Sequence, residues 1–407
     1  MTVKQTLGRT FLKYLRFFAR IQIAKNKLTN PHLKIVGITG SAGKSSTLLA
    51  AEAILTDQFK VKSNHGANSE SGIPLNILGF STPDFSFLSW LKIALLTPFK
   101  ILFYWPKIDV YLLEMGIDSQ KAPKNMAYLL SIVQPDIGIF LNVSPVHLEN
   151  FPSLESIAQE KALLVNQAKL AIINPKDPLV KKFTKNPHKI LIKARKITLK
   201  DYYLPPIYSI SIGAAYELAK SLGMDKTQIL DNLFKNFRLP ASRASLIKGI
   251  NDSLIIDSSY NSSPLATNEL LKFLATFPSP KIAVLGDMRE LGQVSPESHQ
   301  QLYKSALKSA DLIISVGPET SRHFGPKAQK FLYWWQAADY LQDHLSPNST
   351  ILVKGSQNTI FLEELVKTLI PPIQLNYYLS NHLICRQETH WLNRKSNFRK
   401  SVTLSTK

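Results

Sequence analysis

A short apolar strand that runs into a glycine-rich turn and then into a helix is the feature that most constrains this fold. Residues 35–47 read Ile-Val-Gly-Ile-Thr-Gly-Ser-Ala-Gly-Lys-Ser-Ser-Thr. Gly40 and Gly43 allow backbone angles that aim several N–H groups at one point, as a phosphate requires. Lys44 and the Ser45 hydroxyl then stand where such loops place a phosphate-contacting amine and a magnesium ligand. The segment predicts a site for a nucleoside triphosphate and Mg²⁺, formed by Thr39, Gly40, Ser41, Ala42, Gly43, Lys44, Ser45 and Ser46.

Apolar strands alternate with helical patterns along the chain, which predicts an α/β fold. We expect a phosphate-loop central domain with a mostly parallel sheet, and after it a smaller Rossmann-like C-terminal domain. The predicted strands are Lys34–Ile38, Asp109–Leu113, Ile137–Asn142, Leu170–Ile173, Ser253–Ile256, Lys281–Leu285, Leu312–Val316 and Thr350–Val353. The predicted divisions are a basic helix at 1–29, a central domain at 30–237, a C-terminal domain at 238–375 and a basic tail at 376–407.

The net charge of +20 is concentrated at the ends of the chain. Residues 1–29 hold Lys and Arg but no acid, and their apolar residues (among them Leu15 and Ile21) recur at helical spacing, which predicts a basic amphipathic helix. This helix could lie on an anionic membrane surface or pack on the following domain, and both alternatives stay open. No recognition motif is present, so we expect no nucleic-acid partner. The single cysteine, Cys385, excludes an intrachain disulfide, and no signal peptide is visible, so we expect a cytoplasmic protein.

Residues 86–105 form the most apolar stretch of the chain. Lys92, Pro98 and Lys100 interrupt it near the middle, where a membrane-spanning helix rarely tolerates them. We therefore interpret this stretch as an insertion that packs on a domain or lies at an interface. Together with residues 1–29, it is where we expect any peripheral contact with a membrane surface.

Three polar residues are predicted to lie near the phosphate loop. Glu114 ends a strand and would sit at the ligand-binding edge of the sheet, where it could hold magnesium. His147 follows the next strand and could contact a metal or a phosphate. Lys161 falls on the apolar stripe of a helix that Ser153 caps, and a buried ammonium is costly. Its amine could reach the edge of the stripe, become a nucleophile, or react with carbon dioxide to give an anionic metal ligand, and the spacing does not choose among these.

Two polar loops follow strands of the second predicted domain, at 257–264 and at 286–292. As ordinary turns they require no function. As a pair at the same edge of a sheet, they suggest a second wall for the nucleotide site.

Eight segments in order resemble the Mur ligase family, and the resemblance extends from about residue 34 to 369. They are Thr39–Ser45, Asn68–Pro74, Leu113–Gly116, Asn142–Glu149, Ser153–Lys161, Asp257–Pro264, Val284–Gly292 and Leu352–Ser356. The resemblance implies an ATP-dependent amide ligase, in which the γ-phosphate of ATP passes to a substrate carboxylate and an amine then attacks the acyl phosphate.

The resemblance also implies roles for single residues. Lys44 would serve the moving phosphate, and Ser45 and Glu114 would hold one Mg²⁺. His147 and a carbamylated Lys161 would help to place a second Mg²⁺. From the second domain, the nucleotide contacts implied by the family are Arg243, Asp257 and Asn261.

Within the family, the motifs are most similar to ligases that add D-alanyl-D-alanine to a muramyl-peptide precursor, so the implied partners are a cell-wall precursor and a dipeptide or amino-acid amine. Three departures concern the substrate. Only the basic segment 1–29 stands where relatives usually carry a domain for the uridine-nucleotide end. Ser258 replaces the second acid of Asp-Asp-x-Tyr-Asn, and Gln357 replaces an arginine after Lys-Gly-Ser. A lipid-linked precursor, a polyglutamate or cyanophycin-type acceptor, and an inactive nucleotide-binding scaffold stay open as alternatives.

Overall fold

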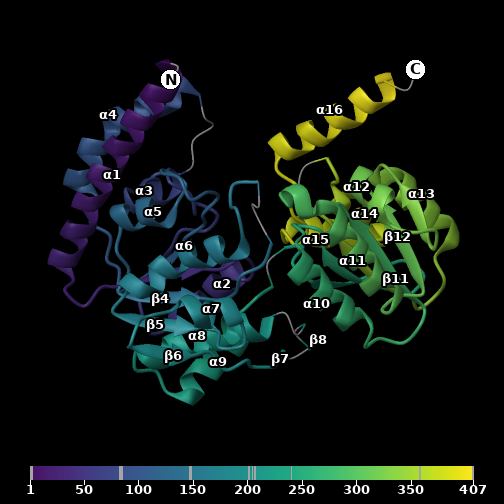
Figure 1. Cartoon of the computed structure of the whole chain (residues 1–407), viewed down its shortest axis with the longest axis horizontal. Helices are drawn as coiled ribbons and strands as arrows, with labels where there is room; N and C mark the ends of the chain where they lie inside the picture. Colours follow the sequence, from purple (N-terminus) through teal and green to yellow (C-terminus); the bar gives the residue numbers. More distant parts are fainter. Residues whose placement is uncertain are drawn as a thin grey trace. The chain divides into compact units, whose positions relative to one another are not determined.

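A computed structural model describes residues 3–81, 86–145, 149–199, 202–203, 205, 208–239, 241–356 and 359–405. The chain divides into two compact units, which Figure 1 shows in purple to teal and in green to yellow. Unit 1 comprises residues 1–204 and 208–237, and unit 2 comprises residues 205–207 and 238–407. Both units have the predicted α/β architecture.

Unit 1 is built on six parallel strands in the order β2-β3-β1-β4-β5-β6. The four strands predicted for this unit are all present, and the sheet gains the short strands β2 and β6 at its two edges. The bounds are β1 Lys34–Thr39, β2 Val61–Ser63, β3 Val110–Glu114, β4 Ile137–Phe140, β5 Leu170–Ile173 and β6 Lys189–Leu191. A separate two-stranded ribbon pairs β7 Thr198–Leu199 with β8 Tyr202–Tyr203.

Helices cover both faces of this sheet, because successive residues of a strand point to opposite faces and both sets are apolar. Ile35 and Leu113 belong to a buried cluster with α5 and α6, while α2 contacts β1 and β3. The helices are α1 Val3–Thr29, α2 Lys44–Leu55, α3 Gly72–Ile77, α4 Phe87–Phe103, α5 Met126–Ile132, α6 Leu154–Gln167, α7 Pro178–Phe183, α8 Ser209–Ser221 and α9 Lys226–Asn236.

The basic N-terminal helix α1 packs on unit 1, against α3, α4 and α5. Leu15 is fully buried, as its helical spacing predicts, but Ile21 is 37% exposed. Gln22 and Asn26 are buried in its place, and they are hydrogen-bonded to each other at 2.8 Å. Among the described residues, no helix combines the length and the apolar character that crossing a bilayer requires.

Unit 2 has a six-stranded sheet in the order β13-β12-β11-β14-β10-β9. Five strands are parallel, and β9 pairs antiparallel with β10 at one edge. The four predicted strands are present, and β9 and β13 were not predicted. The bounds are β9 Ser245–Lys248, β10 Leu254–Ser258, β11 Lys281–Gly286, β12 Leu312–Val316, β13 Ala328–Phe331 and β14 Thr350–Lys354.

The C-terminal segment of unit 2, for which the sequence predicted only a basic tail, contains two helices. These are α15 Pro372–Ser380 and α16 Thr389–Ser405, the latter drawn in yellow in Figure 1. The loop between them carries the buried residues Cys385 and Arg386. The other helical segments of the unit are α10 Pro264–Leu274, η2 Gly292–Val294, α11 Ser295–Leu307, α12 Pro318–His323, α13 Trp334–His344 and α14 Leu362–Thr368.

Candidate active site

The predicted phosphate loop connects β1 to the N-terminus of α2. Gly43 has φ of 83°, a left-handed conformation that glycine adopts without a steric penalty. A Cβ atom at Gly43 would also lie 3.1 Å from the Ser211 hydroxyl of α8, which donates to the Gly43 carbonyl at 3.2 Å. The loop therefore needs glycine at this position. Its N–H groups precede a helix N-terminus, which is the arrangement that binds phosphate.

Asn142, two residues after the end of β4, fixes the shape of the loop. Its side-chain oxygen accepts a hydrogen bond from Ala42 N at 2.8 Å, and its Nδ2 donates to Ala42 O at 3.0 Å. Ser144 N donates to Ser41 Oγ at 3.0 Å, and that hydroxyl donates in turn to the Ser144 carbonyl. Although the motif comparison included Asn142, no role was predicted for it. Its position after a strand that pairs with β1 was the available signal.

Two lysine amines meet at the carbonyl oxygen of Gly40. Lys44 Nζ donates to it at 3.0 Å, and Lys161 Nζ lies 3.4 Å from it. Lys161 comes from the buried face of α6, where the helical spacing placed it, and it is 2% exposed. Burial, reinforced by the positive charge of Lys44, lowers the pKa of Lys161 to about 7. Part of this amine is therefore uncharged at neutral pH, which is the nucleophilic form.

Glu114, at the end of β3, lies beside the first turn of α2. The Ser45 hydroxyl donates to Glu114 Oε2 at 2.8 Å, and Asn68 Nδ2 donates to Glu114 Oε1 at 3.1 Å. A carboxylate and a hydroxyl oxygen in contact are hard ligands that suit Mg²⁺. The described residues contain no cluster of three or more His, Cys, Asp and Glu that could hold a metal by itself. Proteins usually hold Mg²⁺ with one or two carboxylates and leave the other positions to phosphate and water.

The structure thus brings together Lys44, Ser45, Glu114 and Lys161 around the loop, as the sequence predicted. The other predicted loop residues are all part of it, and Thr39 Oγ1 donates to the Met115 carbonyl at 3.1 Å. His147 lies outside the described residues, and so does Gln357.

In unit 2, the residues predicted to face the nucleotide gather at the end of β10 and at the loop that follows it. Asp257 is fully buried, which raises the pKa of its carboxyl group, and its Oδ1 accepts from Ser259 N at 3.0 Å. The Arg243 guanidinium stacks 4.2 Å above the Tyr260 ring. Asn261 is exposed, and its carbonyl accepts from Lys354 Nζ at 2.6 Å.

Lys354 is a member of this group that the sequence analysis quoted in a motif without giving it a role. It ends β14, is 3% exposed, and also lies 3.3 Å from Ser258 Oγ. Burial, with the charge of Arg243, lowers the pKa of Lys354 to about 7. The Lys354 amine is thus buried beside a hydroxyl and a carbonyl, with a serine at the position where the family pattern has an acid.

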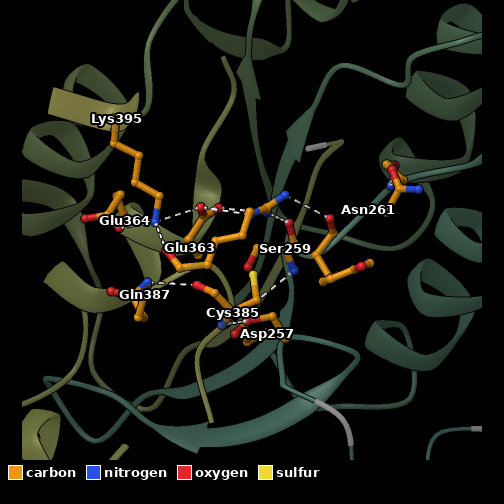
Figure 2. Close-up of polar contacts among 12 residues, drawn as sticks. Asp257, Ser259, Asn261, Glu363, Glu364, Cys385, Gln387 and Lys395 are labelled. Atoms are coloured by element: carbon orange, nitrogen blue, oxygen red, sulfur yellow. Dashed lines mark hydrogen bonds and ion pairs between the residues drawn. The ribbon is translucent and has the colours of Figure 1, made fainter. Parts of the chain in front are cut away.

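A buried ionic network supports this loop from the C-terminal segment. Arg386 has φ of 56°, and its guanidinium makes a two-pronged contact with Glu363 at 3.0 and 2.9 Å. The same guanidinium donates to the carbonyls of Ser259 at 2.7 Å and Tyr260 at 3.2 Å. Figure 2 shows Lys395 pointing to Glu363, with Nζ 3.0 Å from its Oε1. Glu363 is fully buried, so both cations neutralise a charge that water cannot reach.

A phosphate loop with a carboxylate and a hydroxyl suited to Mg²⁺, followed by a Rossmann-like domain, is the architecture of an enzyme that uses a nucleoside triphosphate. Residues 38–205 match the Mur ligase middle domain, and residues 242–357 match the Mur ligase, glutamate ligase domain. Together these matches cover more than half of the chain. The chain therefore belongs to the Mur ligase family of ATP-dependent peptide ligases.

The chain is similar to the UDP-N-acetylmuramoyl-tripeptide–D-alanyl-D-alanine ligase of Bacillus subtilis. The two are 24% identical over 397 residues, which cover 86% of this chain and 78% of the relative. A crystal structure of MurF from Acinetobacter baumannii has the same fold, with a TM-score of 0.71 at 21% identity over 86% of this chain and 79% of that one. The MurF ligase of Thermotoga maritima in complex with ADP gives a TM-score of 0.67 at 22% identity, over 88% and 83% of the two chains.

Proposed function

We propose that this chain joins D-alanyl-D-alanine to a UDP-muramyl-tripeptide at the expense of ATP, a step of peptidoglycan synthesis. The observation that carries the proposal is the set of Lys44, Ser45, Glu114 and Lys161 at one phosphate loop. A scaffold that only bound a nucleotide would not need a buried amine and a carboxylate there. The similarity to relatives named for this reaction supports the choice of substrates.

The proposed reaction has two steps. The precursor carboxylate attacks the γ-phosphorus of ATP, which releases ADP and forms an acyl phosphate. The amine of D-alanyl-D-alanine then attacks the acyl carbon and loses one proton, an amide bond forms, and phosphate leaves with the electron pair of the broken C–O bond. In this scheme Lys44 offsets the negative charge that spreads over the transferred phosphoryl group.

Glu114 and Ser45 would hold Mg²⁺, which supplies positive charge to the phosphates when bound. Asn68 orients the Glu114 carboxylate, since it donates to the oxygen that Ser45 does not contact. His147 belongs to the same proposal, as a residue that would help to place a second Mg²⁺. From unit 2 we assign nucleotide contacts to Arg243 and Asn261, and we assign the buried Asp257 to the same nucleotide site, where it would hold the loop that carries Asn261.

Lys161 takes part in this proposal as a carbamate. Its uncharged amine would add to carbon dioxide and lose a proton, which gives an N-carboxylate. Burial, and after it the charge of Lys44, disfavours a positive charge on Lys161, whereas the N-carboxylate places a negative charge that Lys44 attracts. An anion at this position could serve as a further magnesium ligand.

The test is an ATP-dependent ligation assay on the purified chain. UDP-muramyl-tripeptide with D-alanyl-D-alanine should give ADP, phosphate and the pentapeptide product in equal amounts, and Lys44→Ala should abolish all three. Turnover with a lipid-linked precursor or with glutamate acceptors in place of these substrates would reassign the acceptor. ATP binding without turnover of any of them would indicate the scaffold alternative.

We place this reaction in the cytoplasm, because ATP and a UDP-linked precursor are water-soluble substrates of that compartment. A peripheral contact with the membrane through residues 1–29 and 86–105 also belongs to this proposal. It would bring the ligase close to the bilayer without changing the reaction.

A further inference from the structure

Helix α4 presents a continuous apolar face to the outside of unit 1. Its inner face is closed, since Ile93 and Thr97 are buried. The outer face carries large apolar residues every three or four positions, all between 40% and 78% exposed: Leu88, Leu91, Leu95, Leu96, Phe99, Leu102 and Phe103. Lys92 is the one charged residue among the exposed described residues of this helix. Soluble proteins rarely expose a contiguous apolar patch of this kind unless something binds to it.

This face is held in a fixed orientation by α1, which lies alongside α4 (Figure 1). Near the start of α4, the rings of Phe11 and Trp90 meet edge to face at 5.1 Å. In the middle, the Tyr14 hydroxyl donates to the Ala94 carbonyl at 2.6 Å. At the end, Lys25 Nζ donates to the Tyr104 carbonyl at 2.8 Å. Residues later in α1 contact residues later in α4, so the two helices run parallel. These three contacts hold α4 in place along its whole length.

The charge of the two segments that contain α1 and α4 favours one kind of partner. Residues 1–33 and 86–108 contain no Asp or Glu. Lys13, Arg20, Lys92 and Lys107 are exposed on these segments. Exposed cations on two segments that contain no acid attract anionic lipid headgroups, whereas a second copy of the same basic segments would be repelled. Trp105, 56% exposed just after the helix, has the amphipathic ring that is enriched at membrane–water interfaces.

We propose that the outer face of α4 binds the surface of an anionic lipid bilayer. The helix lies in the plane of the membrane, with its leucine and phenylalanine side chains at the headgroup–acyl boundary and the basic residues among the headgroups. A helix of 17 residues is about 25 Å long, so this contact runs along the surface. This inference rests on the peripheral membrane contact that is part of the proposed function, and it names the protein surface and the lipid chemistry of that contact. It does not depend on which reaction the two domains catalyse.

The experiment is flotation of the full-length chain with lipid vesicles. We expect binding to vesicles that contain phosphatidylglycerol and little binding to pure phosphatidylcholine. The double substitution Leu95→Glu/Phe99→Glu should weaken binding more than tenfold, because two large apolar side chains no longer enter the lipid. Lys92→Gln should weaken it roughly fivefold, and added salt should weaken it further. The matched control is Ile373→Glu in unit 2, since Ile373 is 94% exposed but lies on α15, and its binding should match that of the wild type.

Several outcomes would overturn the proposal. The first is a lack of binding to anionic vesicles, and the second is equal binding of the Leu95→Glu/Phe99→Glu variant when its thermal unfolding matches that of the wild type. A third is a dimer in light scattering that this variant dissociates, which would assign the face to a second copy. Ligation by a chain that does not bind vesicles refutes the membrane contact alone, and vesicle binding by a chain that does not ligate refutes the proposed reaction alone.

Discussion

Replacing Arg386 by methionine should destabilise unit 2 strongly. The substitution leaves Glu363, which is fully buried, with Lys395 as its remaining cation, and it leaves the Ser259 and Tyr260 carbonyls without their Arg386 donors. Removal of one partner from a buried ion pair costs about 3–5 kcal/mol. Because Lys395 stays 3.0 Å from Glu363, we expect a loss near the lower end, about 3 kcal/mol.

The assay is urea unfolding followed by tryptophan fluorescence. The chain has five tryptophans, and in a Trp90→Phe/Trp105→Phe background the remaining three all lie in unit 2. With a urea slope of about 2 kcal/mol per molar for a unit of this size, the midpoint should fall by about 1.5 M. The control is Arg322→Met, since Arg322 pairs with Glu319 at 3.4 Å on the surface. An exposed pair of this kind contributes at most about 1 kcal/mol.

The double substitution Glu363→Leu/Arg386→Met separates the ion pair from simple packing. Without the buried carboxylate, the double variant should recover part of the stability that Arg386→Met loses. A loss below about 1 kcal/mol in Arg386→Met would refute this reasoning. A double variant that is less stable than the single one would refute it as well, because the cost would then not come from an unpaired charge.

Three further predictions concern the phosphate loop and the buried amines. Lys161→Ala should lower turnover at least a hundredfold, and added formate or acetate should restore part of it; unchanged activity would exclude the carbamate. Glu114→Gln should raise the Mg²⁺ concentration for half-maximal activity by roughly tenfold or more. The control is Glu52→Gln, which should leave this concentration unchanged. Glu52 lies in α2 and pairs with His65. The pKa of Lys354 is about 7 in the folded state and 10.5 for the free side chain. Between pH 7 and pH 10.5 the unfolded state therefore binds more protons than the folded state. The free energy of unfolding should rise with pH across this range. Lys354→Met should make that rise shallower in urea titrations at several pH values, and an unchanged slope would contradict it.

The sequence predicted the central strands and the contents of the phosphate loop because these signals are local. Eight apolar runs identified eight strands, and helical spacing placed Lys161 on a buried face. The strands that it missed are short and lie at or near sheet edges. β2 and β6 are only partly buried, so they lack the apolar pattern that identifies a strand.

Contacts between distant segments could not be predicted in the same way. Asn142 is hydrogen-bonded to Ala42 of the phosphate loop, 100 residues earlier in the sequence. Arg386 is hydrogen-bonded to Glu363, although it belongs to a stretch that the sequence predicted to be a basic tail. A charge run is usually solvated, and nothing local distinguishes the one arginine whose charge is buried. The sequence also could not predict which face of α4 is exposed. The helix is apolar on both faces, and the spacing of its residues does not say which face packs on the domain.

The network at Arg386 has a consequence for the order in which the protein forms during synthesis. Arg386 bonds to the Ser259 carbonyl from 127 residues further along the chain. All the strands of unit 2 are complete once β14 has been made, whereas Glu363 follows β14 and gains its two cations only when Arg386 and Lys395 have also been made. A growing chain that ends at residue 370 therefore has a complete sheet but an uncompensated buried charge behind the loop of Asp257 and Asn261. Unit 2 reaches its final state only when the segment through Lys395 has left the ribosome, so the loop of Asp257 and Asn261 is among the last parts to reach its final structure.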